Sequence, residues 1–201
     1  MNTDLPSYID SAVDLGCHEG YPGHHTYNTL LEQNLLRGRG WTEFSLYPLF
    51  SPQSLLAEGS ANYGVDLAFP GDERIAFERD ELFPLAGLDA SEADLYYQVM
   101  ELRGQLNYAG NEAARRYLNG TFSSDQAQEW LLSYALDDPE RAAKRIHFYD
   151  AYRSYVINYN YGKDLVADWV NAGSANSEER WERFTRLLST PISPSDLTGR
   201  E

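Results

Sequence analysis

Residues 18–25 read HEGYPGHH, and this stretch holds three of the four histidines in a chain of 201 residues. So dense a group is not expected where histidine is otherwise scarce. Imidazole nitrogens beside a carboxylate are the usual parts of a zinc site, because the nitrogens bind the ion and the carboxylate can take a proton from bound water. The stretch therefore predicts a metal site, around which the chain must bend.

The spacing of the histidines excludes a straight helix through this stretch. The common zinc-peptidase arrangement places two histidines four residues apart on one helix, but Pro22 stands four residues after His18. On an unbroken helix His24 would lie about 120° around the axis from His18, and His25 would lie about 10 Å farther along it. Neither could share an ion with His18. We therefore expect a kink over residues 20–23, where proline and glycine permit one.

Helix signals continue along the rest of the chain. Residues 7–20 carry apolar side chains at helical spacing, and Ser51-Pro52 reads as a helix N-cap followed by proline in the first turn. Strand patterns are nearly absent. We expect an all-α fold, with a kinked metal-binding helix pair and long C-terminal helices. The expected helices cover residues 7–20, 24–36, 51–69, 74–83, 91–118, 124–136, 140–170 and 177–188.

One helical domain is expected over residues 1–190, followed by a flexible tail over 191–201. The apolar content of 42% is ordinary for a soluble globular protein. The formal net charge of -15 repels phosphate backbones and anionic lipids, so neither nucleic acid nor a membrane surface is an expected partner.

The termini and the cysteine bear on location and redox chemistry. No apolar run approaches the roughly 18 residues of a membrane span, and the N-terminus lacks the pattern of a signal peptide, so a cytoplasmic protein is expected. A removed signal peptide, or a missing N-terminal portion, stays open because the metal motif begins at residue 18. Cys17 is the single cysteine, and we expect a small buried apolar residue, with a thiolate ligand as the alternative.

The stretch 18–25 resembles the His-Glu-x-x-Pro-Gly-His-His hallmark of the bacterial family called domain of unknown function 885. That family is similar to the gluzincins, helix-rich zinc peptidases whose third ligand is a glutamate on a later helix. Its Glu-Gly-x-Ala-x-Tyr segment is matched by residues 58–63, EGSANY. Its Pro-Gly-Gln-Ala-x-x-Tyr-x-x-Gly segment is matched over residues 153–162 at Tyr159 and Gly162 but not at the Pro-Gly-Gln. The resemblance implies a C-terminal, metal-bearing portion.

The same resemblance implies a zinc-dependent, peptidase-like hydrolase that binds one zinc ion and cleaves a peptide or a small amide. His18 and His24 look like two zinc ligands and Glu58 looks like the third. Glu19 looks like the general base. His25 stays open as a rival ligand or as a contact to the substrate.

Supporting residues are expected around these ligands. Asn62, one turn after Glu58, is expected to orient that carboxylate, and Asp14, one turn before His18, is expected to accept the other N–H of that ring. In related peptidases a histidine and tyrosine set on a late helix hydrogen-bonds the oxyanion. The candidates on the helix expected at 140–170 are His147, Tyr152, Tyr155 and Tyr159.

An alternative hypothesis is that the chain is not an enzyme. It would then be a truncated or inactive peptidase-like module whose metal site is structural or silent and which acts in binding. An open fourth position on the metal favours the enzyme, whereas closure by His25 or Cys17 favours a structural site. A third reading is a metal hydrolase acting on an ester or small amide. If an N-terminal portion is absent, exposed apolar surface predicts self-association or binding to a separate partner.

Overall fold

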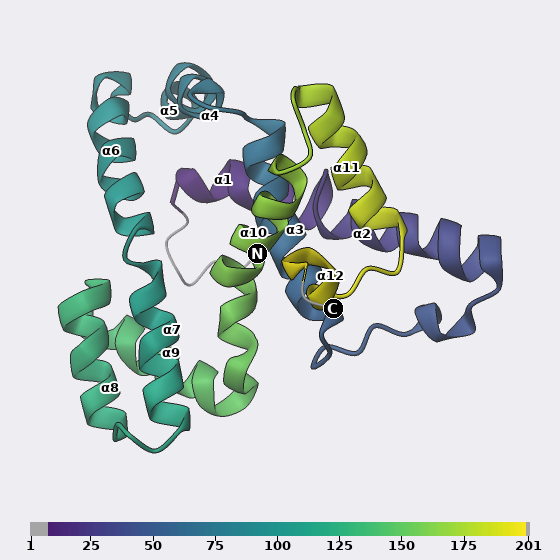
Figure 1. Ribbon diagram of the computed structural model, residues 1–201. Helices are drawn as coiled ribbons and strands as arrows, with labels where there is room; N and C mark the ends of the chain where they lie inside the picture. The colour runs from purple at the N-terminus through teal and green to yellow at the C-terminus, as the bar shows by residue number, and fades with distance from the viewer. Residues whose placement is uncertain (1–7, 200–201) are drawn as a thin grey trace.

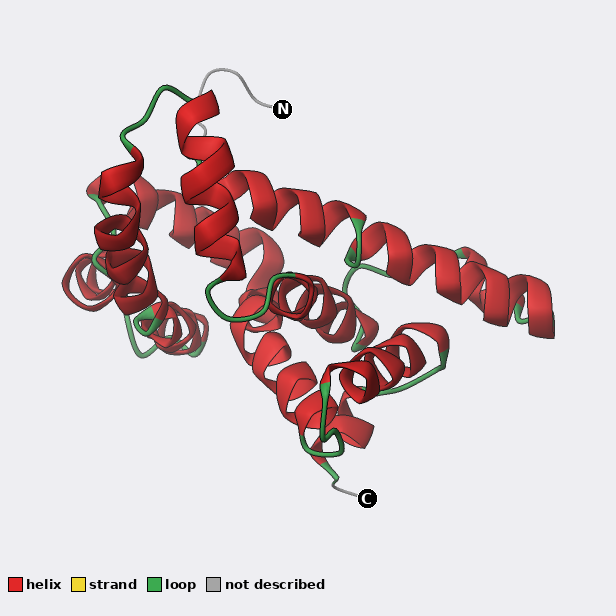
Figure 2. Cartoon of the chain, turned by 90° about the horizontal axis from the view of Figure 1, so that it is seen from above, coloured by secondary structure: helices red, strands yellow, loops and turns green. Residues whose placement is uncertain are grey.

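The computed structural model describes residues 8–199, and all regular structure in that range is helical (Figure 1, Figure 2). The prediction of an all-α fold is confirmed. The α-helices are α1 (Asp10–Leu15), α2 (His24–Leu31), α3 (Gln53–Ala68), α4 (Glu73–Phe77), α5 (Phe83–Leu85), α6 (Ala93–Gly104), α7 (Asn107–Leu118), α8 (Ser124–Trp130), α9 (Pro139–Tyr152), α10 (Ile157–Asn171), α11 (Ser177–Ser189) and α12 (Pro194–Thr198). Within residues 8–199 no helix combines the length and the apolar character that crossing a membrane requires.

Helix α3 lies at the centre of the molecule and is buried on most of its surface (Figure 1). A helix with apolar and small residues all round must be covered on all sides. Its start differs from the sequence-based expectation. The helix begins at Gln53, and Pro52 occupies the N-cap position without a side-chain hydrogen bond. The buried hydroxyl of Ser51 has no hydrogen-bond partner within residues 8–199. The prediction of Ser51 as the capping side chain is therefore wrong.

Helices α3 and α10 touch through their backbones, because each carries a glycine at the contact. A Cβ atom on Gly59 would lie 2.4 Å from the carbonyl carbon and oxygen of Gly162. A Cβ atom on Gly162 would lie 2.7 Å from the carbonyl oxygen of Leu55. Only glycine at both positions permits this approach. The contact brings two segments about a hundred residues apart in the sequence to one place.

The largest apolar core packs around these two helices. Helices α2, α11 and α12 contribute to it together with α3 and α10. Its members include Tyr27, Leu31, Leu56, Tyr63, Val166, Phe184, Leu188 and Leu197. The expectation of a flexible tail over 191–201 is wrong for residues 191–199. There Leu197 packs into this core, and Ser193 and Asp196 form a capping box at the start of α12; residues 200–201 lie outside the described range.

A second apolar core lies apart from the first, between α7, α8 and α9 (lower left in Figure 1). Its centre is the fully buried Tyr149, whose hydroxyl donates to the carbonyl oxygen of Gly110 over 3.0 Å. The short helices α4 and α5 and the longer α6 connect the two regions.

Two expected long helices are each broken in the structure. The helix expected at 91–118 is α6 followed by α7, interrupted at residues 105–106 directly after Gly104. The helix expected at 140–170 is α9 followed by α10, and the break is a 3₁₀ turn, Arg153–Val156, that begins at a positive φ of 56°. The second break has a clear reason: α9 packs in the second core and α10 in the first, so the chain must change direction between them.

Gly59→Ala is expected to lower the free energy of unfolding by about 2–3 kcal/mol, because the new methyl group meets backbone that cannot rotate away. The melting temperature should fall by roughly 4–12 °C for a domain of this size. Thermal unfolding followed by circular dichroism measures it. Gly104→Ala is the matched control, since a Cβ atom there meets nothing within 4 Å. An equal loss of stability in both variants would contradict the close contact of α3 with α10.

Candidate metal centre

The histidine stretch forms a helix, a sharp turn and a second helix. Helix α1 continues as a π-helical turn over Gly16–Gly20, and α2 begins at His24. Between them the backbone N–H of Gly23 donates to the carbonyl oxygen of Cys17 over 2.9 Å. A Cβ atom on Gly23 would lie 1.9 Å from the carbonyl oxygen of His18, so the turn requires glycine there. The kink predicted over residues 20–23 is confirmed.

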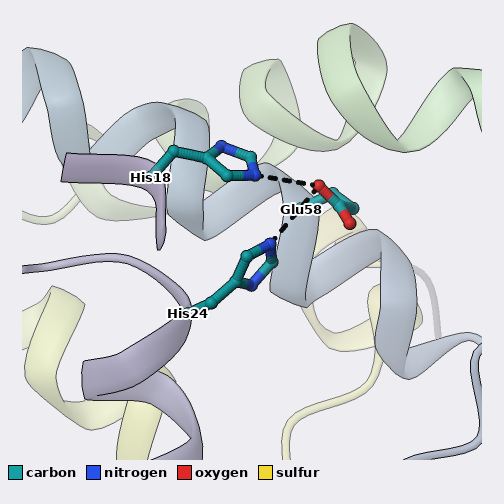
Figure 3. A group of neighbouring side chains, drawn as sticks. All are labelled: His18, His24 and Glu58. Carbon is teal, nitrogen blue, oxygen red and sulfur yellow. Dashed lines mark ion pairs between the residues drawn. The ribbon is translucent and has the colours of Figure 1, made fainter. Parts of the chain in front are cut away.

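The turn places two imidazoles against a carboxylate of α3. The Nε2 atom of His18 lies 3.3 Å from Oε2 of Glu58, and Nε2 of His24 lies 3.6 Å from the same oxygen. Figure 3 shows both rings pointing at the carboxylate. One ligand atom from each of the three residues lies within 4.8 Å of the others. We call His18, His24 and Glu58 the metal triad; in residues 8–199 it is the single cluster of this kind.

The triad fits a metal ion by its chemistry and by one buried atom. Glu58 is 8% exposed, and its Oε2 atom is buried without a hydrogen-bond partner among the described residues. A buried carboxylate oxygen without a partner is costly unless a ligand satisfies it. Two imidazole nitrogens and a carboxylate oxygen are a donor set that zinc accepts. The triad therefore has what is needed to bind a metal ion.

The charge state of the carboxylate suits this role. Burial acts to raise the pKa of Glu58, but the neighbouring imidazoles of His18 and His24 and the hydroxyl of Tyr155 outweigh it and lower that pKa to about 2. The pKa of His18 is raised: burial lowers it, and the contact with Glu58 more than reverses that effect. The triad thus presents an ionised carboxylate to any ion that enters.

Asn62 fixes the ring of His18. Its Nδ2 group donates to the carbonyl oxygen of Tyr159 over 2.8 Å, so its Oδ1 atom faces His18 at 2.9 Å from Nδ1. An amide oxygen only accepts, so Nδ1 of His18 carries the proton and Nε2 keeps its lone pair for a metal. The expectation that Asn62 orients Glu58 is wrong. Asn62 lies on the same face of α3 one turn later but turns toward the histidine.

Asp14 does not accept the other N–H of His18, because Asn62 occupies that place. Its Oδ1 atom instead lies 2.6 Å from Nη1 of Arg74, whose Nε donates to the fully buried Glu78 over 3.0 Å. The expectation for Asp14 is therefore wrong. Asp14 was expected to contact His18 because it lies one helical turn before that ligand. The guanidinium of Arg74, on α4, binds the carboxylate of Asp14 instead.

Two of the three tyrosines expected as oxyanion donors, Tyr155 and Tyr159, lie near the triad but in different surroundings. The hydroxyl of Tyr155 donates to Oε1 of Glu58 over 2.8 Å, and the residue is buried. Tyr159 is 39% exposed and lines the cavity beside the triad. Burial, followed by the charge of Glu58, raises the pKa of Tyr159 to about 12. Tyr155 therefore supports a ligand, whereas Tyr159 faces the open side.

The remaining candidates lie outside the triad. His147 is on an exposed position of α9 and does not line the cavity, so the structure does not bring it to the triad. Tyr152, on the same helix, packs on Phe148 and Phe50. His25 is exposed and its ring lies 5.1 Å from that of Tyr21. Cys17 is buried with Val13 and Val65, as expected for a small apolar residue.

The triad opens onto a cleft of about 1950 Å³. His18, His24 and Glu58 line one part of it, with Asn62 and Tyr159. Glu19, exposed on the π-helical turn, lines the same cleft. The metal triad, the expected base Glu19 and the phenol of Tyr159 therefore all line the same cleft.

Comparison with models of protein families, with curated proteins and with solved structures found no match. Of the site residues, sequence reasoning did not find the bond from Tyr155 to Glu58. No local signal could have revealed it, because the bond depends on how α10 crosses α3. The role of Asn62 was predicted in part. A polar side chain one turn after a ligand commonly supports a metal site, but the expected partner was Glu58 and the observed partner is His18.

Asn62→Ala is expected to weaken metal binding by about 10- to 100-fold, because His18 loses the acceptor that fixes its tautomer and ring orientation. Competition with a zinc-sensitive dye measures the dissociation constant. Asn34→Ala is the control, since Asn34 is exposed and bonds only to its own helix. Unchanged zinc affinity in Asn62→Ala would contradict the assigned role.

Proposed function

We propose that the chain is a zinc-dependent hydrolase that cleaves peptide or small amide bonds. The observation that carries this proposal is the buried, unpartnered Oε2 atom of Glu58, which lies against two imidazoles at the edge of a large cleft. The presence of Glu19 in the same cleft supports a catalytic role rather than storage or transport of the ion.

The metal would be held by His18, His24 and Glu58. A zinc ion in this position supplies Lewis-acid chemistry, which polarises a carbonyl oxygen and makes a water acidic enough to lose its proton near neutral pH. Structural zinc sites are closed by four protein ligands. Neither Cys17 nor His25 belongs to the described cluster, which favours a site open to substrate over a structural one.

Glu19 would act as general base and then as general acid. It follows His18 directly, and its negative charge acts on both His18 and Tyr159, raising the pKa of each. A carboxylate in this position takes a proton from the attacking water and passes it to the leaving amine.

Tyr155 and Tyr159 would have different roles. Tyr155 already donates its hydrogen to Glu58, so it would position the carboxylate rather than touch the substrate. Tyr159 has a pKa of about 12, so it stays protonated at neutral pH and can donate a hydrogen bond to the developing oxyanion. The proposal agrees with the resemblance to the domain of unknown function 885 family, which implies the same three ligands and the same base.

Glu19→Gln is expected to keep about one zinc ion per chain and to lose hydrolysis, because a base does not bind the ion. His18→Ala should lose the ion itself. Elemental analysis of the purified variants and cleavage of a mixed peptide library measure the two effects. If Glu19→Gln releases zinc, or if it still cleaves at the parent rate, the division of roles between Glu19 and His18 is wrong.

Tyr159→Phe and Tyr155→Phe are expected to differ, although each removes one hydroxyl. Tyr159→Phe should lower kcat by about 10²–10³ with zinc affinity unchanged, as for loss of an oxyanion donor. Tyr155→Phe should weaken zinc binding by about 10-fold or more, because Glu58 loses its support. Identical behaviour of the two variants would contradict these assignments.

A further inference from the structure

The cleft beside the metal triad is larger than a small-molecule site. Its volume of about 1950 Å³ exceeds the roughly 300–1,000 Å³ of drug-sized pockets. Its lining includes residues of α1, α2, α3, α4, α6, α7, α9 and α10, so it extends from the triad to helices that hold no triad residue. An extended peptide would fill such a space, whereas a small amide would contact only a part of it.

Every cationic side chain in the lining is already neutralised by a carboxylate of the chain. The nitrogen-to-oxygen distances in these pairs are 2.6–2.9 Å. The pairs are Arg74–Asp14, Arg79–Asp80, Arg145–Asp137 and Lys163–Asp66. An anionic substrate would therefore find no available cation in this lining.

Five carboxylates in the lining have no ion-pair partner within residues 8–199. Two of them accept a hydrogen bond from a phenol, Asp10 from Tyr96 and Asp164 from Tyr108, but a phenol does not cancel the charge. The five are Asp10, Glu19, Asp72, Glu101 and Asp164. Charges of one sign inside a concave, low-dielectric surface focus their field into it. The cleft is therefore negative by its own residues, beyond the overall charge of the chain.

The charged positions come from several walls of the cleft and extend away from the triad. Asp10 lies on α1, Glu101 on α6 and Asp164 on α10. Glu58 shows where a peptide in this cleft would meet the proposed metal, because its buried, unpartnered Oε2 atom lines the same cleft. Carboxylates placed along an elongated cleft match cationic side chains spaced along an extended chain.

We propose that the substrates of this site are peptides carrying basic side chains, bound along the cleft by carboxylates that the protein leaves without a cation. This proposal rests on the proposed function, and it adds the class of substrate. Lysine or arginine side chains would reach Glu101 and Asp164, while the backbone lies near the triad.

Binding can be measured without hydrolysis in zinc-loaded Glu19→Gln. The probe is a short fluorescent peptide rich in arginine, followed by anisotropy and compared with versions carrying citrulline or glutamate in place of arginine. We expect the arginine peptide to bind about 10-fold or more tighter than the citrulline peptide, with affinity falling as salt is raised. Equal binding of the arginine and citrulline peptides would overturn the proposal.

Matched variants separate the cleft from the overall charge. Glu101→Gln with Asp164→Asn removes two charges from the lining and should weaken binding of the arginine peptide by about 3- to 10-fold. Glu129→Gln with Glu182→Gln removes two charges from exposed positions outside the lining and should leave binding within about twofold. Equal weakening by both pairs would show general attraction to an acidic protein and would overturn the proposal.

Cleavage of the same peptides by the parent chain separates the two proposals. Charge-dependent binding without cleavage of any peptide would support the ligand class and contradict the hydrolase. Cleavage of all three peptides with equal kcat/KM would support the hydrolase and overturn the preference for basic peptides.

Discussion

The contact between α3 and α10 is the constraint on which the site depends. Because Gly59 and Gly162 have no side chains, the two backbones touch, and Glu58 lies directly beside that contact. The same approach brings the hydroxyl of Tyr155 to Glu58 and the carbonyl oxygen of Tyr159 to Asn62. The carboxylate is thus held from the 3₁₀ turn that precedes α10, and the residue that fixes His18 is held from α10 itself, both about a hundred residues away. Larger side chains at the crossing would separate them.

The second requirement is the turn between His18 and His24. A straight helix would place these rings on different faces, and the Gly23 turn brings their centroids to 4.6 Å with the planes nearly perpendicular. Residues 18–24 alone form this turn. The triad therefore combines one long-range contact with one local turn, and each half can be tested by a separate substitution.

The turn between His18 and His24 could be predicted from the sequence, because it depends on only a few neighbouring residues. His18, His24 and Glu58 were predicted from the resemblance of two short motifs to a known family, and the kink was predicted from the spacing of the histidines on a helix. The break at residues 153–156 could not be predicted, because it depends on α9 joining one apolar core and α10 the other. Helix α12 was missed although Ser193-Pro194 repeats the signal noted at Ser51-Pro52. The polarity of the last residues concealed one buried leucine, Leu197.

X-ray absorption at the zinc edge of the zinc-loaded chain tests the central claim most directly. The triad predicts nitrogen and oxygen neighbours at about 2.0–2.2 Å, with the outer-shell scattering of two imidazoles. Removing Glu58 as Glu58→Gln should change the oxygen shell and leave both imidazoles in place. A sulfur neighbour at about 2.3 Å would place Cys17 on the metal. That result, or the scattering of a single imidazole, would contradict a site built from His18, His24 and Glu58.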